Sequence, residues 1–226
     1  MTVAEAISLV RTILDEPKYE YYGSSSSLNA TIIDALNKAA SMVAKECWYR
    51  GEKEALRPLW RETTATLDIN QRAVMPEQFM FIESVRSNFR SGTAKPYLHV
   101  YVDPGIFRRR QMRNPSEGNS GSSANAFTKF VSRAEYTIIG GNVYATGSTL
   151  APTNNKNVII SYIRVPVVSS VLTDQMPLAE YMHATICDTA AGVLYRKDHP
   201  GDNRPNVGGL IDVEASLYQL MRGQQK

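Results

Sequence analysis

Few side chains in this sequence could do chemistry, and their spacing does not group them. The three histidines, His99, His183 and His199, fall in a strand pattern, in a helix pattern and beside a turn. His183 lies four residues before Cys187, so both side chains could share one face of a helix. A metal site needs two further ligands, and the spacing suggests none. We interpret the pair as a partly buried histidine and a core cysteine, and we expect no metal and no cofactor.

Motifs for a nucleophile or for a phosphate group are not recognisable either. Serine-rich segments supply hydroxyl groups, but no nucleophile elbow and no base at a recognisable spacing accompany them. Gly140-Gly141 indicates a hairpin, because no Lys-Ser or Lys-Thr follows it as in a phosphate-binding loop. Aspartates and glutamates are scattered rather than paired. We expect no catalytic residues and a protein that is not an enzyme; a site assembled from distant positions is the remaining alternative.

The densest positive cluster consists of Arg108, Arg109, Arg110 and Arg113. One interpretation is contact with nucleic acid or with an acidic protein surface, because guanidinium groups bind phosphates and carboxylates. The other interpretation is a solvated loop base, and the sequence favours neither. The first interpretation makes a nucleic-acid-binding module the main alternative function of the chain.

Two further groups of residues are candidate interface residues. Tyr19, Tyr21 and Tyr22 precede a serine-rich loop, and exposed aromatic clusters often anchor interfaces. The alternative is that these tyrosines cover the base of the helical bundle. We prefer the interface role, because the neighbouring sequence cannot supply a core of its own. A narrow apolar stripe lies near the C-terminus, on a helix that is marginal alone: Leu210, Val213, Leu217 and Leu220. We expect this stripe to dock on a partner.

The composition is that of a globular chain with little net charge. Hydrophobic residues make up 43% of the 226 residues, which is enough for a core. With 25 basic and 22 acidic residues, the net charge of +3 provides only a weak general attraction to nucleic acid. The start of the chain does not resemble a secretory leader, and no apolar run is long enough to cross a bilayer. We expect Cys47 and Cys187 to be buried free thiols.

The hydrophobic periodicity predicts helices at both ends and strands between them. Thr2 and Glu5 form a capping box before a first helix, and Ser27 and Gly51 bound a second. A third helix is expected from Pro177, and the stripe near the C-terminus forms the last. Strands are expected at 63–69, 79–86, 97–102, 127–131, 136–139, 143–144 and 158–165, with a helical turn within 106–113 and an exposed loop at 114–125.

These patterns predict an α+β fold: an α-helical bundle from the N- and C-terminal segments with an inserted antiparallel β region. The expected bundle domain comprises residues 1–60 and 170–226. The expected β-rich insertion comprises residues 61–169. Residues 205–226 are a possible C-terminal docking segment.

Three stretches carry a resemblance to a known family. They are 33–40 in the second helix; 67–76 with 81–85 at the start of the β region; and 160–166, 176–183 and 190–198 near the end. The first reads Ile-Asp-Ala-Leu-Asn-Lys-Ala-Ala, and the second contains Gln71 and an apolar-Pro step at Met75-Pro76. The third reads as a strand ending at Pro166, followed by a Pro-opened helix with Tyr181 and His183. In this order the stretches resemble the head-to-tail connector, or adaptor, proteins of tailed bacteriophages, including the tail-tubular-protein-A-like proteins of short-tailed phages.

The resemblance implies a virion structural protein in the neck or tail, assembled in the host cytoplasm. It implies a dodecameric ring that binds the portal protein, presents a platform to downstream tail or nozzle proteins and extends the DNA channel. DNA would pass through the channel without sequence-specific binding, and no membrane would be involved. In such a ring we expect the arginine cluster to face protein rather than DNA, because a dense basic circle would hold DNA that must slide. Residues 104–157 resemble no part of the family.

Overall fold

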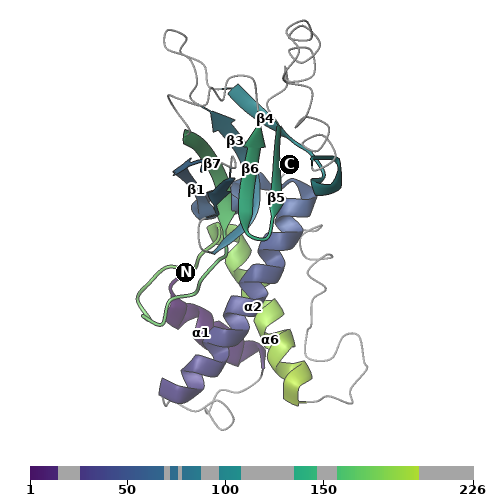
Figure 1. The fold of residues 1–226 in the computed structure, drawn as a ribbon. Helices are drawn as coiled ribbons and strands as arrows, with labels where there is room; N and C mark the ends of the chain where they lie inside the picture. The colour runs from purple at the N-terminus through teal and green to yellow at the C-terminus, as the bar shows by residue number, and fades with distance from the viewer. Residues whose placement is uncertain are drawn as a thin grey trace, which may run out of the picture. The chain divides into compact units, whose positions relative to one another are not determined.

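The computed structural model describes residues 1–14, 26–68, 72–75, 78–87, 97–107, 135–146 and 157–198. The chain divides into two compact units, whose elements are labelled in Figure 1. The helical unit comprises Met1–Leu59 and Val165–Lys226, and the sheet unit comprises Trp60–Arg164. The sheet unit is thus inserted, in sequence, between the two parts of the helical unit.

The first helix, α1 (Val3–Ile13), begins at the capping box that the sequence predicts. The Thr2 hydroxyl accepts a hydrogen bond of 3.3 Å from the N–H of Glu5, and a Glu5 carboxylate oxygen accepts one of 2.8 Å from the N–H of Thr2. These bonds satisfy N–H groups that no helical carbonyl can reach. One face of α1 is buried: Val3, Ala6, Ile7 and Val10.

The second helix, α2 (Ser26–Arg50), runs the length of the helical unit. It ends before Gly51, as predicted, and Gly51 has a φ of +77° that favours glycine. Its buried face carries small residues, which let a neighbouring helix approach closely: Ala35, Ala39, Ala40 and Ala44. After α2 the chain continues through α3 (Lys53–Leu56) and the 3₁₀ turn η1 (Arg57–Leu59).

The helix α6 (His183–Asp198) packs against both α2 and α1. The prediction that this helix begins at Pro177 is wrong, since the 3₁₀ turn η2 (Glu180–Met182) precedes α6. The reason is a tertiary contact. Ala179 has an extended backbone, with ψ 146°, and its N–H donates a hydrogen bond of 3.3 Å to the carbonyl of Ala55.

The sheet unit contains a seven-stranded sheet in the order β1-β7-β3-β4-β5-β6-β2. Its strands are β1 (Trp60–Thr66), β2 (Arg72–Val74), β3 (Phe79–Ser87), β4 (Tyr97–Tyr101), β5 (Glu135–Ile139), β6 (Asn142–Thr146) and β7 (Asn157–Arg164). Neighbouring strands pair antiparallel, except that β4 and β5 pair in parallel. The two outermost strands, β1 and β2, contact each other, so the sheet is a nearly closed barrel.

The inner face of the barrel holds a hydrophobic core of its own. The buried members come from most strands of the sheet and from the segments beside β1 and β2: Leu67, Ala73, Met75, Val85, Tyr136, Val143, Ala145, Val158 and Ile160. Full burial of one such aliphatic side chain contributes about 1.5–3 kcal/mol to folding. The sheet unit is therefore stabilised by its own packing.

The hairpin between β5 and β6 confirms the turn expected at Gly140-Gly141. Both glycines have a positive φ, +56° and +75°. Two successive residues with positive φ are typical of the tight turn whose twist matches that of two antiparallel strands. The two strands pair from Glu135 with Thr146 to Ile139 with Asn142.

The expected fold class, a helical bundle with an inserted antiparallel β region, is wrong. The chain is a mixed α/β protein in which the nearly closed seven-stranded sheet dominates. The strand pattern overlooked β2, which has three residues and is too short for alternation to be visible. Local patterns also do not reveal that β4 and β5 are parallel or that β1 and β2 meet. The expected strand at 127–131 and most of the range 106–113, in which a helical turn was expected, lie outside the described residues. A helical turn is observed at residues 104–107.

Among the helices of the described residues, none combines the length and the apolar character that crossing a bilayer requires.

Candidate functional site

The interface residues predicted from the sequence lie outside the described residues. These are the tyrosines 19, 21 and 22, the arginines 108, 109, 110 and 113, and the C-terminal stripe Leu210, Val213, Leu217 and Leu220. Their predicted roles stay predictions. The candidate site must therefore be sought among the described residues of each unit.

The two described histidines are buried, and each belongs to a different unit. His99 lies on β4, where its Nδ1 is 3.4 Å from the carbonyl oxygen of Glu135. His183 opens α6, and its Nε2 is 2.8 Å from the carbonyl oxygen of Leu178. Burial lowers the pKa of His183 and outweighs the opposing hydrogen bond to Leu178, so the imidazole is neutral at pH 7. His199 lies outside the described residues.

Cys47 and Cys187 are both buried and free, as predicted. Burial raises the pKa of each thiol to about 12, which leaves almost no thiolate near neutral pH. The Cys187 sulfur lies 3.8 Å from the carbonyl oxygen of Ala6. Within the described ranges, no group of three His, Cys, Asp or Glu residues could hold a metal ion.

A polar network crosses three strands of the sheet unit. Ser161 on β7 is buried, and its hydroxyl donates a hydrogen bond of 3.1 Å to a carboxylate oxygen of Glu62 on β1. Arg86 on β3 donates to the same hydroxyl at 3.1 Å and forms an ion pair with Glu62. These bonds satisfy the serine and join β1, β7 and β3.

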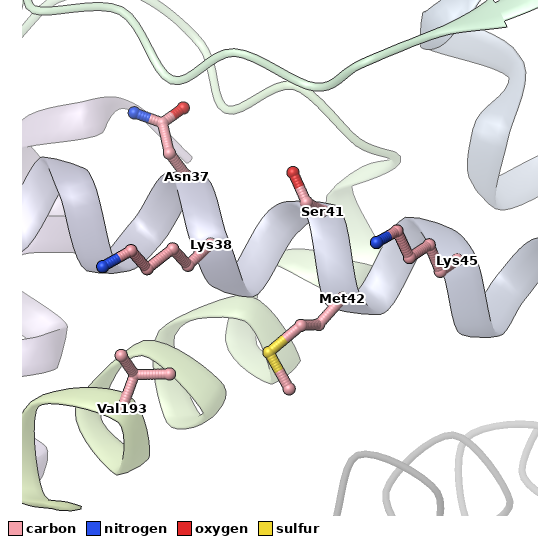
Figure 2. A pocket seen from close by; sticks show the side chains of 6 residues that line it. All are labelled: Asn37, Lys38, Ser41, Met42, Lys45 and Val193. Atoms are coloured by element: carbon pink, nitrogen blue, oxygen red, sulfur yellow. The ribbon is translucent and has the colours of Figure 1, made fainter. Parts of the chain in front are cut away.

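A shallow groove of about 470 Å³, widely open to solvent, lies on the helical unit between α2 and α6 (Figure 2). It is lined by Asn37, Lys38, Ser41, Met42, Lys45 and Val193. Five of these residues come from α2, and Val193 comes from α6. Figure 2 shows the Met42 side chain extending from α2 toward the helix that carries Val193.

The helical repeat places the groove residues on an exposed stripe of α2. The stripe consists of residues spaced by three or four positions, all of them exposed: Asp34, Lys38, Met42, Lys45 and Tyr49. Lys38 and Lys45 are seven residues apart, which is about two helical turns. Met42 lies between them and is 49% exposed, and Tyr49 at the end of the stripe is 76% exposed.

The groove thus has an apolar floor flanked by two ammonium groups. Among the described residues, no carboxylate lines the groove and Lys38 and Lys45 form no ion pair, while Asp34 lies one helical turn before Lys38. Asn37 at its rim is engaged, because its Oδ1 accepts a hydrogen bond of 2.7 Å from the N–H of Val168. Such a surface is suited to an apolar segment that carries negative charge.

Sequence reasoning did not single out this groove. Asn37 and Lys38 entered that reasoning only through the family-like stretch 33–40, and Val193 only through the family-like stretch 190–198. The signal that could have found it is the pair Met42 and Tyr49. These two large side chains lie on the same side of α2 as the lysines, which is the side that an amphipathic helix turns to solvent.

Large apolar side chains are also exposed elsewhere in both units. In the helical unit they lie between β7 and α6: Val167, Val171 and Leu172. In the sheet unit, Val74 on β2 is 74% exposed, and Leu98 on β4 is 63% exposed. Leu98 and Val100 alternate with the buried His99, so they share the outer face of β4.

No protein-family model matches this chain, and no curated protein matches it. Its function is therefore inferred from its own residues and their arrangement.

Proposed function

We propose that this chain is a virion structural protein that forms a head-to-tail connector ring between the portal and the tail of a tailed bacteriophage. In this role it binds other copies of itself, the portal protein and downstream tail proteins, and it extends the channel through which DNA passes. It acts through its surfaces rather than through a catalytic site. The localisation that follows is the neck or tail of the virion.

The observation that carries the proposal is the exposure of large apolar side chains on regular, hydrogen-bonded elements of both units. Tyr49 projects from a 25-residue helix, and Leu98 projects from a paired strand. Isolated exposed apolar residues are ordinary on protein surfaces. A stripe on α2 and an outward row on β4, by contrast, are typical of surfaces that bind other proteins.

The order of the sequence motifs supports the same proposal. The stretches 33–40, 67–76 with 81–85, and 160–166 with 176–183 and 190–198 resemble the connector family in the same order along the chain. A closed ring needs two different, complementary faces on each copy, because neighbours meet head to tail. A protein with exposed apolar surfaces on separate elements can provide such faces.

The residues predicted from the sequence complete the proposal. The stripe Leu210, Val213, Leu217 and Leu220 would dock on the portal. The arginines 108–110 and 113 would face acidic residues of an adjoining ring, where guanidinium groups form bidentate contacts. The tyrosines 19, 21 and 22 would anchor an interface.

The test is the mass and shape of the purified protein, measured alone and after mixing with the portal protein of the same phage. We expect light scattering to report a large closed oligomer and particle images to show a ring with a central channel. The variant Tyr49→Ser should weaken assembly, whereas Glu54→Gln, which alters an equally exposed side chain, should not. A protein that stays monomeric with and without the portal would contradict the proposal. A monomer that binds DNA in a salt-sensitive complex would favour the nucleic-acid-binding alternative.

A further inference from the structure

The segment between β7 and α6 is held firmly at the start of α1. The carbonyl of Asp174 accepts a hydrogen bond of 2.9 Å from the N–H of Val3, and the carbonyl of Leu172 accepts one of 3.0 Å from the N–H of Ala4. These bonds satisfy two N–H groups in the first turn of α1, which has no helical partners for them. The backbone of the segment is thereby fixed.

The same segment turns its large apolar side chains to solvent. Val167 and Val171 are each 53% exposed, and Leu172 is 42% exposed. Two carboxylates accompany them, since Asp174 ends the segment and Glu5 lies in the first turn of α1. The hydrogen bonds from Thr2 lower the pKa of Glu5 and keep this carboxylate charged. The α-amino group of Met1 is nearby and donates to the side-chain oxygen of Gln175 at 3.4 Å.

A fixed backbone that exposes apolar side chains favours binding, because little further ordering is needed when a partner covers them. We define this surface, Val167 to Asp174 with Glu5, as the acidic ridge. It is complementary to the groove between α2 and α6. The ridge offers branched apolar side chains and two carboxylates, and the groove offers an apolar floor and two ammonium groups.

Within one copy the ridge meets the groove at its rim, where the N–H of Val168 donates to the side-chain oxygen of Asn37. The ridge is held at the start of α1 by the hydrogen bonds of Leu172 and Asp174, whereas Met42 and Val193 of the groove lie between α2 and α6. Figure 1 shows the segment after β7 beside the start of α1, close to the N label. Leu172 and Asp174 are held at the start of α1, and their exposed side chains remain available to the groove of another copy.

We propose that the acidic ridge of one copy docks in the α2–α6 groove of the next copy. This contact rests on the proposed function, and it names the two faces that meet around the ring. Val171 and Leu172 lie on the floor formed by Met42 and Val193. Asp174 and Glu5 face Lys38 and Lys45. The contact joins different surfaces of identical chains, so it repeats from copy to copy until the ring closes.

The second copy is a better occupant than nucleic acid. Phosphate groups would use the two lysines but would leave the exposed Met42 side chain without an apolar partner. Binding to nucleic acid would also not involve the acidic ridge, whose carboxylates repel phosphates. The ridge and the groove together account for both sets of exposed side chains.

The experiment uses two variants of the full chain. The groove variant carries Met42→Asp and Lys45→Glu, and the ridge variant carries Val171→Asp and Leu172→Asp. The controls are Arg57→Glu and Glu54→Gln, whose side chains form an exposed ion pair. Circular dichroism and thermal unfolding establish whether each variant is folded. We expect folded variants, because all the substituted side chains are exposed.

Sedimentation velocity should then show a pattern that is specific to a head-to-tail contact. The groove variant and the ridge variant should each require at least tenfold higher concentration to assemble, while the controls assemble as the unmodified chain does. An equimolar mixture of the two variants should form one-to-one pairs and nothing larger, because it contains one intact ridge and one intact groove. A mixture that stays monomeric would overturn the proposal.

A charge exchange tests the same contact without apolar changes. The single change Asp174→Lys should weaken assembly, and so should the double change Lys38→Glu with Lys45→Glu. All three changes in one chain should restore at least part of the assembly.

If the ridge variant forms normal rings, this contact is overturned while the ring itself stands. If the unmodified chain forms no ring with or without portal, the proposed function fails as well. If the groove variant only loses binding to mixed-sequence duplex DNA and still assembles, the groove is a nucleic-acid site and the proposal is overturned.

Discussion

The side-chain oxygen of Asn37 accepts a hydrogen bond of 2.7 Å from the backbone N–H of Val168. The two residues are 131 positions apart in the sequence, and the bond ties the middle of α2 to the segment that follows β7. Val168 is buried, so its N–H cannot turn to water if the acceptor is lost. The bond also fixes the point at which the acidic ridge leaves the surface of α2.

Removal of this acceptor should destabilise the protein. We expect Asn37→Ala to lower the free energy of unfolding by about 1–3 kcal/mol, because a buried N–H is left without a partner. Asn37→Asp keeps an oxygen at the same place and should cost less. Denaturant unfolding of both variants measures the difference. Equal losses for the two variants would show that the acceptor is not what matters at this position.

The two thiols should be unreactive in the folded protein. With a pKa of about 12, each buried thiol has a thiolate fraction of about 10⁻⁴ at pH 8. A disulfide reagent such as DTNB should modify Cys47 and Cys187 only at the rate of unfolding, and should modify both at once in denaturant. Fast labelling of either residue in the native protein would contradict the burial of both thiols. The variant Cys187→Ala should leave the slow labelling of Cys47 unchanged.

The network of Glu62, Arg86 and Ser161 should be energetically coupled. Ser161→Ala removes a hydroxyl that both donates and accepts, so we expect a loss of about 1 kcal/mol in the free energy of unfolding. Glu62→Gln should cost less, because the Glu62 side chain is about half exposed and partly solvated. A double-mutant cycle over the two changes should give a coupling energy of at least about 0.5 kcal/mol. Additive losses would mean that the three residues do not act together.

The capping box of α1 should appear in a pH titration of Glu5. The backbone N–H and the hydroxyl of Thr2 lower the pKa of Glu5 below its ordinary value of 4.5. A carboxylate with a lowered pKa stabilises the folded state above pH 4.5, and this contribution is lost as the pH falls through the lowered value. NMR titration should therefore place the Glu5 midpoint below 4.5. Thr2→Ala removes the hydroxyl but keeps the N–H, so the midpoint should rise part of the way.

The Thr2→Ala variant also tests the cap as a source of stability. Loss of a threonine N-cap costs about 0.5–2 kcal/mol in helix or protein stability. The same change should loosen the start of α1, to which the acidic ridge is hydrogen-bonded. We therefore expect reduced protection of the Val3 and Ala4 amides in hydrogen exchange. Unchanged protection would show that the ridge carbonyls hold this turn without the cap.

The sequence by itself determined the features whose causes lie within a few residues. Thr2 and Glu5 are three positions apart, and their reciprocal hydrogen bonds set the start of α1. Gly51 ends α2, and Gly140-Gly141 turns the chain between β5 and β6, because these backbones adopt a positive φ. Alternation of apolar residues likewise indicated most of the strands, including β7.

Only the tertiary structure decided how distant segments meet. The start of α6 depends on a hydrogen bond from Ala179 to Ala55, and the closure of the sheet depends on contact between β1 and β2. The groove requires Met42 and Val193, which are about 150 residues apart in the sequence, to lie on adjoining helices. Local patterns specify which side of an element faces a core but not which other element supplies that core. The fold class was therefore mispredicted, and the groove with its complementary ridge became visible only when the packing of α1, α2 and α6 placed them.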